Sequence, residues 1–431
     1  MGASHIISKK PVSCSLPQAL SYFVYIRVVR LTLSYFFPVE EYGPVCAITA
    51  PGRKTTVIIS DHKAANKVFL QTPYARSQLR VSILRRHVGR GLLTEEGETH
   101  RRQRKIANPA FTARAVLNMA DVIQEKTALL MERLQKHVAA DESPEAARYG
   151  SRKDVAPDFQ YTTLDVIGKA GFGFEFNSLG SDEQAKATSF QSAIGQSMRL
   201  ISTGSLYSGL RLFFGAPVVF FGRLFRVEEQ LLLDRTRKSM DQVCTDLVQR
   251  AKIDAEREGE GTATARDVLS LMVRSNVAAD VKPSQRMSHE ELMNTIPVLL
   301  AAGFETTSAT LSFASLRLST DPRGAEIQHR VREELANAHG WTENASIVDE
   351  LPYLEAVVRE TLRHSPTIRR MSRDAPYDDV IPLSRPITLR DGTTTSQIRV
   401  AKGDGIELPV WYMNTCTELW GPDAKEFRPE R

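Results

Sequence analysis

A carboxyl group and two neighbouring hydroxyls interrupt a strongly apolar stretch of this chain. They belong to the run AGFETT, residues 302–307, which lies in the middle of residues 288–320. Polar groups lose their water when they are buried, so a core retains them only for a specific reason. This run is therefore the first candidate for a functional site.

Two pairs of charged residues have helical spacing. Glu360 and Arg363 are three residues apart and can form a charge-assisted pair, although surface helices contain many such pairs. Arg431, in the final WGPDAKEFRPER, offers a second guanidinium for the same carboxylate. His100 and Arg104 share a face of a basic helix, which predicts either a solvated face or a face that binds an anionic group.

Residues 288–320 are predicted to form one long helix that positions the first cluster. Ser288 and Glu291 have the spacing of a capping box, and Asp321-Pro322 ends the helix. At 1.5 Å per residue this helix is roughly 50 Å long, enough to cross a whole domain. Its middle is apolar on nearly every face, which indicates a central core helix.

The remaining elements predict a mainly α protein with small β-sheets, an α+β fold. Two short strands surround a turn near residue 51, and further strands begin near residue 377. No long Gly, Ser and Pro linker divides residues 42–431, so they are predicted to form one domain. Residues 1–41 contain an apolar segment, 16–38, interrupted by arginines. That segment predicts either a membrane-surface helix or a packed first helix.

Charge and cysteine content bear on the expected partners and on the redox compartment of the protein. The net charge of +5 arises from 56 basic and 51 acidic residues. This mild excess is spread along the chain, so nucleic acid is not an expected partner. The four cysteines form no CxxC pair, which favours unpaired thiols in a reducing compartment.

Two glycine-containing stretches remain. TTLDVIGKAGFG, residues 162–173, lacks the spacing of a phosphate-binding loop, so its glycines predict close helix packing. Residues 199–226 are oily and broken by glycine and proline. They predict a mouth for hydrophobic ligands or a membrane-facing patch, with a plain core element as the alternative.

Three motifs in order resemble the cytochrome P450 haem-thiolate monooxygenases, most closely the eukaryotic microsomal branch. They are AGFETT in a long helix, ETLR on a later helix, and FRPER after a strand-rich segment. GETHRRQRKIANPAF, TTLDVIGKAGFG and NTCTELWGPDAKEF also match. The resemblance runs from about residue 42 to residue 431, and it implies the cytochrome P450 fold.

The resemblance also implies roles for individual residues. Glu305 and Thr306 would be the catalytic acid and alcohol that supply protons beside the haem. Ala302 and Gly303 would leave room for dioxygen and allow the helix to open locally. His100, where the family commonly has tryptophan, would join Arg104 and Arg373 in binding the haem propionates. Glu360, Arg363 and Arg431 would form a buried structural triad.

One family feature is missing from this sequence. The iron ligand of the family is a cysteine in a loop close to FxxGxRxC, and no cysteine here has that surrounding. No metal ligand is therefore assigned. The expectation is a chain truncated before that loop, inactive as it stands and explained best by an incomplete gene model. The alternative is a haem-free scaffold or a remnant that binds hydrophobic ligands.

The resemblance implies cofactors, partners and location as well. Haem b would receive NADPH electrons through a flavin reductase that docks near Arg101, Arg102 and Lys105. The substrate would be a hydrophobic small molecule, with specificity from the segment after Gly89, from 199–226, from the face around Ala302 and from 367–371. The expected location is the cytosolic face of the endoplasmic reticulum membrane.

Overall fold

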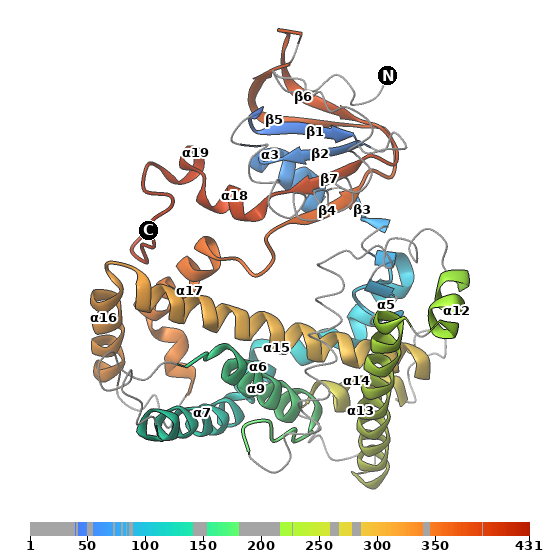
Figure 1. The fold of residues 1–431 in the computed structure, drawn as a ribbon, viewed down its shortest axis with the longest axis vertical. Helices are drawn as coiled ribbons and strands as arrows, with labels where there is room; N and C mark the ends of the chain where they lie inside the picture. The colour runs from blue at the N-terminus through green and yellow to red at the C-terminus, as the bar shows by residue number, and fades with distance from the viewer. Residues whose placement is uncertain are drawn as a thin grey trace. The chain divides into compact units, whose positions relative to one another are not determined.

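The computed structural model describes a large part of the chain, in two compact units. The described residues are Val39 and most of 42–140, 153–180, 216–258, 267–277, 286–338 and 345–431. The first unit combines residues 1–83, 200–214 and 362–427, and the second combines 84–199, 215–361 and 428–431 (Figure 1). The predicted N-terminal helix within 16–38 lies outside the described residues, as do residues 199–215 of the oily segment.

The first unit is built on a five-stranded sheet. The predicted hairpin after residue 42 is confirmed, because β1 (Val45–Thr49) and β2 (Thr55–Ile59) pair antiparallel. The strand order continues with β7 (Gly405–Leu408), parallel to β2, and then β4 (Met371–Asp374) and β3 (Ala75–Arg76). A second, two-stranded sheet contains β5 (Asp379–Thr388) and β6 (Thr394–Val400).

Asp61 connects these two sheets within the first unit. One carboxylate oxygen accepts from the backbone N–H groups of Lys63 and Ala64, each at 3.0 Å, and so caps α3 (His62–Asn66). The other oxygen accepts from the backbone N–H of Ser384 on β5 at 2.9 Å. The short elements η1 (Lys67–Gln71), α18 (Val410–Thr415) and α19 (Thr417–Trp420) complete this unit.

The second unit is almost entirely helical, and the predicted fold class, mainly α with small sheets, is confirmed. The final residues of its last helix, α17, belong to the first unit. Its elements are α5 (Gly97–Ala107), η2 (Asn108–Phe111), α6 (Ala113–Leu117), α7 (Ala120–Ala140), α9 (Ala156–Val166), η3 (Ile167–Gly171), α12 (Ala216–Leu224), α13 (Glu228–Glu258), α14 (Val268–Val277), α15 (His289–Thr320), α16 (Gly324–Asn337), η5 (Ala345–Glu350) and α17 (Pro352–His364).

Helix α15 is the predicted central helix, and its predicted ends are confirmed. The backbone N–H of Glu291 donates to Ser288 Oγ at 3.1 Å, and the N–H of Ser288 donates to Glu291 Oε2 at 2.8 Å. These two bonds satisfy N–H groups that have no partner inside the helix. Asp321 is extended and ends the helix.

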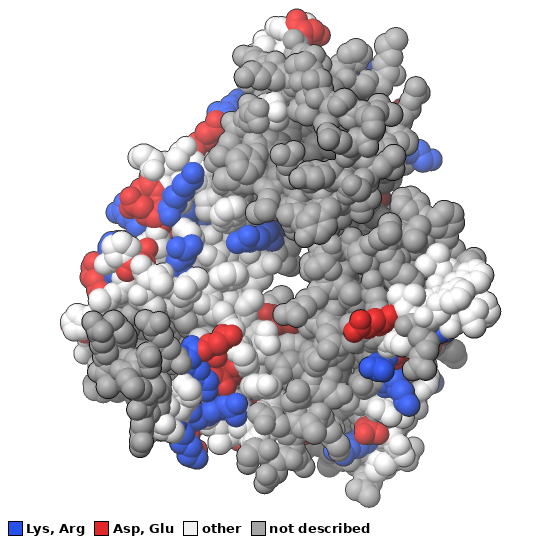
Figure 2. All heavy atoms as spheres, in the orientation of Figure 1, with Lys and Arg blue, Asp and Glu red and all other residues white. Residues whose placement is uncertain are grey.

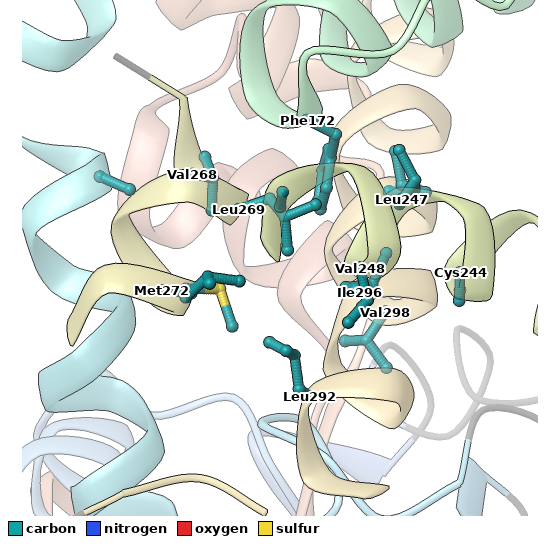
Figure 3. Packing of buried hydrophobic residues seen from close by; sticks show 14 of the residues in the cluster. Phe172, Cys244, Leu247, Val248, Val268, Leu269, Met272, Leu292, Ile296 and Val298 are labelled. Carbon is teal, nitrogen blue, oxygen red and sulfur yellow. The ribbon is translucent and has the colours of Figure 1, made fainter. Parts of the chain in front are cut away.

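The main apolar core of the second unit surrounds the first half of α15. Figure 3 shows Leu292, Ile296 and Val298 of α15 beside side chains from α13 and α14. The neighbours labelled there are Cys244, Leu247, Val248, Val268, Leu269 and Met272, all buried. Burial of this apolar area is the main stabilising term for the unit.

Charged side chains of the two signs are mixed on the surface. Figure 2 shows Lys and Arg beside Asp and Glu on the described part of the face drawn. Several form ion pairs, such as Lys169 with Glu125 at 2.8 Å and Arg323 with Glu430 at 3.0 Å.

The loop before α5 packs closely against the backbone of α15 at Gly91. A Cβ on Gly91 would lie 2.9 Å from the carbonyl oxygen of Asn294 and 3.3 Å from Thr295 Cα, both backbone atoms of α15. We expect Gly91→Ala to lower the free energy of unfolding by about 1–3 kcal/mol, because a backbone must move to admit the methyl group. Urea unfolding measures the change.

Gly180→Ala is the matched control. Its Cβ would meet only Asn177 O, at an ordinary 3.5 Å. That variant should be neutral or more stable by up to about 1 kcal/mol, since alanine restricts the unfolded chain. Equal effects of the two substitutions would show that the close approach of this loop to α15 is not a constraint.

Candidate active site

At residues 300–306, α15 has one packed face and one open face. Leu300 and Phe304 are only 0% and 1% exposed, whereas Ala302 and Thr306 are exposed. The open face carries small side chains and a hydroxyl beside the packed first half of α15, whose buried residues all lie between Leu292 and Ser308. Cofactor sites are largely apolar with a few placed polar groups, and this face has that composition.

Side-chain hydroxyls bind five consecutive backbone carbonyls of this turn. The α-helix is continuous here, so each carbonyl also faces the helical N–H four residues later. Such additional bonds compete with the helix ladder and make a turn easier to deform. The donors are Thr306 to Ala302 O at 2.6 Å, Thr307 to Gly303 O at 2.8 Å, Thr163 to Phe304 O at 3.0 Å, Ser308 to Glu305 O at 3.1 Å and Thr310 to Thr306 O at 2.9 Å.

Glu305 is the acidic group of this turn. Burial raises the pKa of its carboxyl from 4.5 to about 7, because the charged form loses hydration. Its side chain makes no hydrogen bond or ion pair with another described residue. A carboxyl group that titrates near neutral pH can both hold and release a proton, as acid–base chemistry requires.

Gly303 lies on the packed side of the turn. A Cβ at this position would be 2.8 Å from Ile167 Cγ1 and 3.1 Å from Ile167 Cδ1. The close packing of α15 against η3, which continues α9, therefore requires glycine here. This is a different reason from the predicted space for dioxygen, which stays a prediction.

His100 and Arg104 lie on α5 in the same unit. The Arg104 side chain is exposed and has no partner among the described residues. Its neighbour Arg102 instead forms an ion pair with Glu291, the residue that caps α15. The capping carboxylate therefore ties α5 to the start of α15, a link that no sequence motif indicated.

Arg373, the third predicted propionate ligand, lies on β4 in the first unit. Its Nη1 donates to the carbonyl of Ser372 at 3.0 Å, and its guanidinium lies 4.3 Å from the centre of the Phe69 ring. Stacking on an aromatic ring holds the planar guanidinium in one orientation. Within its unit, Arg373 is thus a partly buried, oriented cation.

Glu360 and Arg431 of the predicted triad meet in the second unit. Glu360 is 5% exposed, and its Oε1 accepts from the backbone N–H of Arg428 at 2.7 Å. Arg431 Nε lies 3.7 Å from the same oxygen. The carboxylate thus holds residues 428–431 by a backbone hydrogen bond and by charge.

Arg363 donates hydrogen bonds to three backbone carbonyls within the first unit. This buried guanidinium binds the chain that follows α18 and also lies 4.9 Å from the Trp420 ring centre. Hydrogen bonds from a charged donor are among the stronger ones in proteins. Nη1 donates to Asn414 O at 2.6 Å and Ala424 O at 2.8 Å, and Nη2 donates to Glu426 O at 3.0 Å.

The described cysteines do not resemble metal ligands. Burial raises the pKa of the Cys46 thiol to about 12 and raises that of Cys244 as well, which disfavours the thiolate. Cys416 is 7% exposed, with its sulfur 3.7 Å from Met413 O. No group of three or more possible metal-ligating side chains occurs within the described part of the chain.

Sequence reasoning missed the contact between Thr163 and the candidate turn. TTLDVIGKAGFG predicts close helix packing, but Gly168 packs against the irregular segment that follows η3, since a Cβ there would lie 2.4 Å from Phe176 Cδ2. The motif did not indicate the partner of its second threonine, because a hydroxyl carries no sequence signal for the distant carbonyl that it meets.

Comparison with known proteins gives a consistent family. The family model described as cytochrome P450 matches residues 35–431. Cytochrome P450 monooxygenase 205 of Postia placenta is 34% identical over 407 residues, covering 91% of this chain and 71% of that protein. Cytochrome P450 monooxygenases claP and claO of Ampulloclitocybe clavipes are 33% and 32% identical, covering 91% and 98% of this chain and 70% and 76% of those proteins.

The raised pKa of Glu305 predicts a pH-dependent stability. The unfolded chain releases this proton near pH 4.5 and the folded chain near pH 7. Between these values the folded state binds more protons, so its free energy of unfolding should fall as pH rises, by up to ~1.4 kcal/mol per unit. Above about pH 7 this contribution should be constant.

Glu305→Gln should remove this slope, as measured by urea unfolding from pH 4.5 to 8. Glu350→Gln, which changes an exposed carboxylate of the same unit, is the control and should keep the wild-type slope. Wild type and Glu305→Gln curves that stay parallel would show that the carboxyl is ionised in the folded protein over the whole range.

Proposed function

Because this chain belongs to the cytochrome P450 family, we propose that it oxidises a hydrophobic small molecule at a haem b bound beside Ala302 and Thr306. The chain is by family a monooxygenase, which places one oxygen atom of dioxygen in its product. The open face of α15 next to Glu305 carries the proposal. Haem, when bound, supplies the binding and activation of dioxygen.

The protein's own contribution is proton delivery at the open face. Glu305 holds a proton at neutral pH and can exchange it, since its pKa is about 7. Thr306 Oγ1 donates to Ala302 O at 2.6 Å, so its lone pairs remain available to accept a proton from a neighbouring donor. The carboxyl and the hydroxyl together can pass one proton toward the open face and take up another.

Haem carboxylates require cations with fixed N–H groups. We assign His100 and Arg104 of α5 and Arg373 of β4 to them, since arginine binds carboxylates through two parallel hydrogen bonds. Glu360, Arg363 and Arg431 have a structural role in this proposal, because Glu360 and Arg363 bind backbone groups after α17 and Arg431 pairs with Glu360. No cysteine among Cys46, Cys244 and Cys416 is proposed as the iron ligand, as all three are buried.

Electrons are proposed to come from NADPH through a flavin reductase that docks on α5. Arg101 and Lys105 are exposed and suit an acidic partner surface. Arg101 and Arg102 already pair with Glu98 and Glu291, so a reductase would meet them as parts of these ion pairs.

A membrane surface is proposed beside α12, consistent with the cytosolic face of the endoplasmic reticulum. Four large apolar side chains are more than half exposed there, and two of them stack with ring centres 6.1 Å apart. Clustered aromatic side chains with no core partner favour a lipid interface. They are Phe220, Phe221, Leu224 and Phe225, at 64%, 52%, 60% and 72% exposure.

Helix α15 is the one described helix that is long and apolar enough to cross a membrane. Its apolar residues Leu292, Ile296 and Leu300 are instead buried in the core of the second unit. That packing accounts for its composition, so α12 rather than α15 is the proposed membrane contact.

A second candidate function is a haem-free binder of hydrophobic ligands. The burial of Cys46, Cys244 and Cys416 favours it, because a buried neutral thiol is a poor iron ligand. Titration of the purified protein with haem separates the two candidates. A protein that takes up no haem supports the binder, and stoichiometric uptake of haem supports the monooxygenase.

Thr306→Ala tests the proton-delivery role in the haem-loaded protein. We expect haem content to stay unchanged while the product formed per NADPH consumed falls by about tenfold or more, the scale of one acid–base contribution. Product and NADPH are measured in the same reaction with a reductase. Unchanged coupling would remove Thr306 from the mechanism.

Thr307→Ala is the matched control for this test. Thr307 is also exposed and also donates to a carbonyl four residues earlier, at 2.8 Å from Gly303 O. Its loss should therefore reproduce any effect on the helix alone and leave coupling within about twofold. Equal uncoupling by the two variants would indicate a general loosening of α15.

The membrane proposal predicts weaker binding to lipid vesicles when the α12 patch is made polar. Phe221→Ser with Phe225→Ser should lower partition into phosphatidylcholine vesicles by about tenfold or more, because two aromatic side chains no longer enter the interface. Phe111→Ser, which changes an isolated Phe that is 56% exposed, is the control. Equal partition of both variants would show that α12 does not contact lipid.

A further inference from the structure

One face of α9 and its continuation η3 meets α15 directly before Glu305. Thr163 and Ile167 are four residues apart, so they lie on the same side of this helix. Thr163 Oγ1 is 3.0 Å from the carbonyl oxygen of Phe304, and Ile167 fills the space that the missing side chain of Gly303 leaves. Two consecutive residues of α15 are thus held by one turn of its neighbour.

Among the five hydroxyl bonds of this turn, the Thr163 bond alone comes from another helix. The hydroxyls of Thr306, Thr307, Ser308 and Thr310 all belong to α15 and move with it. They cannot fix the turn in relation to the rest of the unit. A hydroxyl from α9 can, because Thr163 is 6% exposed and its neighbours Thr162 and Leu164 are buried as well, at 5% and 0%.

The Thr163 hydroxyl has more acceptors than protons. It also lies 2.9 Å from Phe159 O and 3.2 Å from Gln160 O, both in its own helix. A threonine that bonds only inside its helix would have no influence on α15. Thr162 shows that case, since its hydroxyl donates to Asp158 O at 2.8 Å and it is equally buried, at 5%.

We propose that Thr163 is a positioning residue: its hydroxyl donates to Phe304 O and, with Ile167 against Gly303, fixes the turn that carries Glu305 and Thr306. This inference rests on the proposed function for its consequence in catalysis. The contact itself does not depend on that function. Without the Thr163 contact the turn, already weakened by competing hydroxyls, would sample several positions. Glu305 and Thr306 would then no longer be held in one position.

Hydrogen exchange of α15 tests the contact without any cofactor. Thr163→Val removes the hydroxyl at constant shape, and we expect backbone amides 304–308 to exchange about five- to tenfold faster, the factor that corresponds to one net hydrogen bond. Amides 292–297 should be unchanged. Thr163→Ser, which restores a hydroxyl, should return exchange to within about twofold of wild type.

Thr162→Val is the matched control, because it removes the adjacent hydroxyl from the same buried helix. It should leave amides 304–308 within about twofold of wild type. Equal exchange in Thr162→Val and Thr163→Val would mean that Thr163 donates inside its own helix, and the inference would be wrong. Should Thr163→Val not fold, Thr163→Ala removes the same hydroxyl with less bulk and carries the same expectation.

Coupling in the haem-loaded protein gives the second readout. Thr163→Val should lower product per NADPH at unchanged haem content, whereas Thr163→Ser and Thr162→Val should not. Faster exchange in Thr163→Val together with normal coupling in Thr306→Ala would remove Thr306 from the proposed mechanism and leave the contact standing. Uncoupling in Thr306→Ala with normal exchange in Thr163→Val would overturn the inference alone.

Discussion

The candidate site depends on how closely α9 and its continuation η3 approach α15. Gly303 has no side chain, and Ile167 occupies the space that one would need. This contact holds one side of the turn in the core, so the opposite side, with Ala302 and Thr306, is left for a ligand. A helix packed on every side could hold the same residues and have no site. The asymmetry of the packing therefore leaves an exposed face on a buried helix, and this face is where the proposed site lies.

The same asymmetry explains the chemistry of Glu305. Its backbone belongs to a turn that is packed through Phe304, and its side chain loses enough water for the pKa to rise to about 7. A carboxyl on a fully solvated helix would stay ionised at neutral pH and could not hold a proton. A carboxyl deep in the core could not reach a ligand. The boundary between packed and open faces is the place where both conditions are met.

Local patterns in the sequence were sufficient for the elements and insufficient for their contacts. The capping box of Ser288 and Glu291 involves residues that are close in the chain, so spacing alone predicted it. The carbonyls bound by Arg363 are 51 to 63 residues away, and any backbone can supply a carbonyl. The Thr163 contact is hidden for the same reason. Every residue has a backbone carbonyl, so the residue types in a sequence do not show which carbonyl a side chain will bind.

Glu291 makes both a local contact, within its own helix end, and a long-range contact, with another helix. Its Oε2 closes the capping box, which is local, and its Oε1 receives Arg102 and Gln103 of α5, which is not. The cap fixes the rotamer of the side chain, so the second oxygen presents itself to α5 at no further loss of side-chain entropy. The start of α15 therefore orients α5, while Thr163 and Ile167 hold the middle of α15. A rigid helix attached at both places can carry Glu305 and Thr306 at a defined distance from the basic residues of α5, which is the arrangement that a bound cofactor with carboxylates would need.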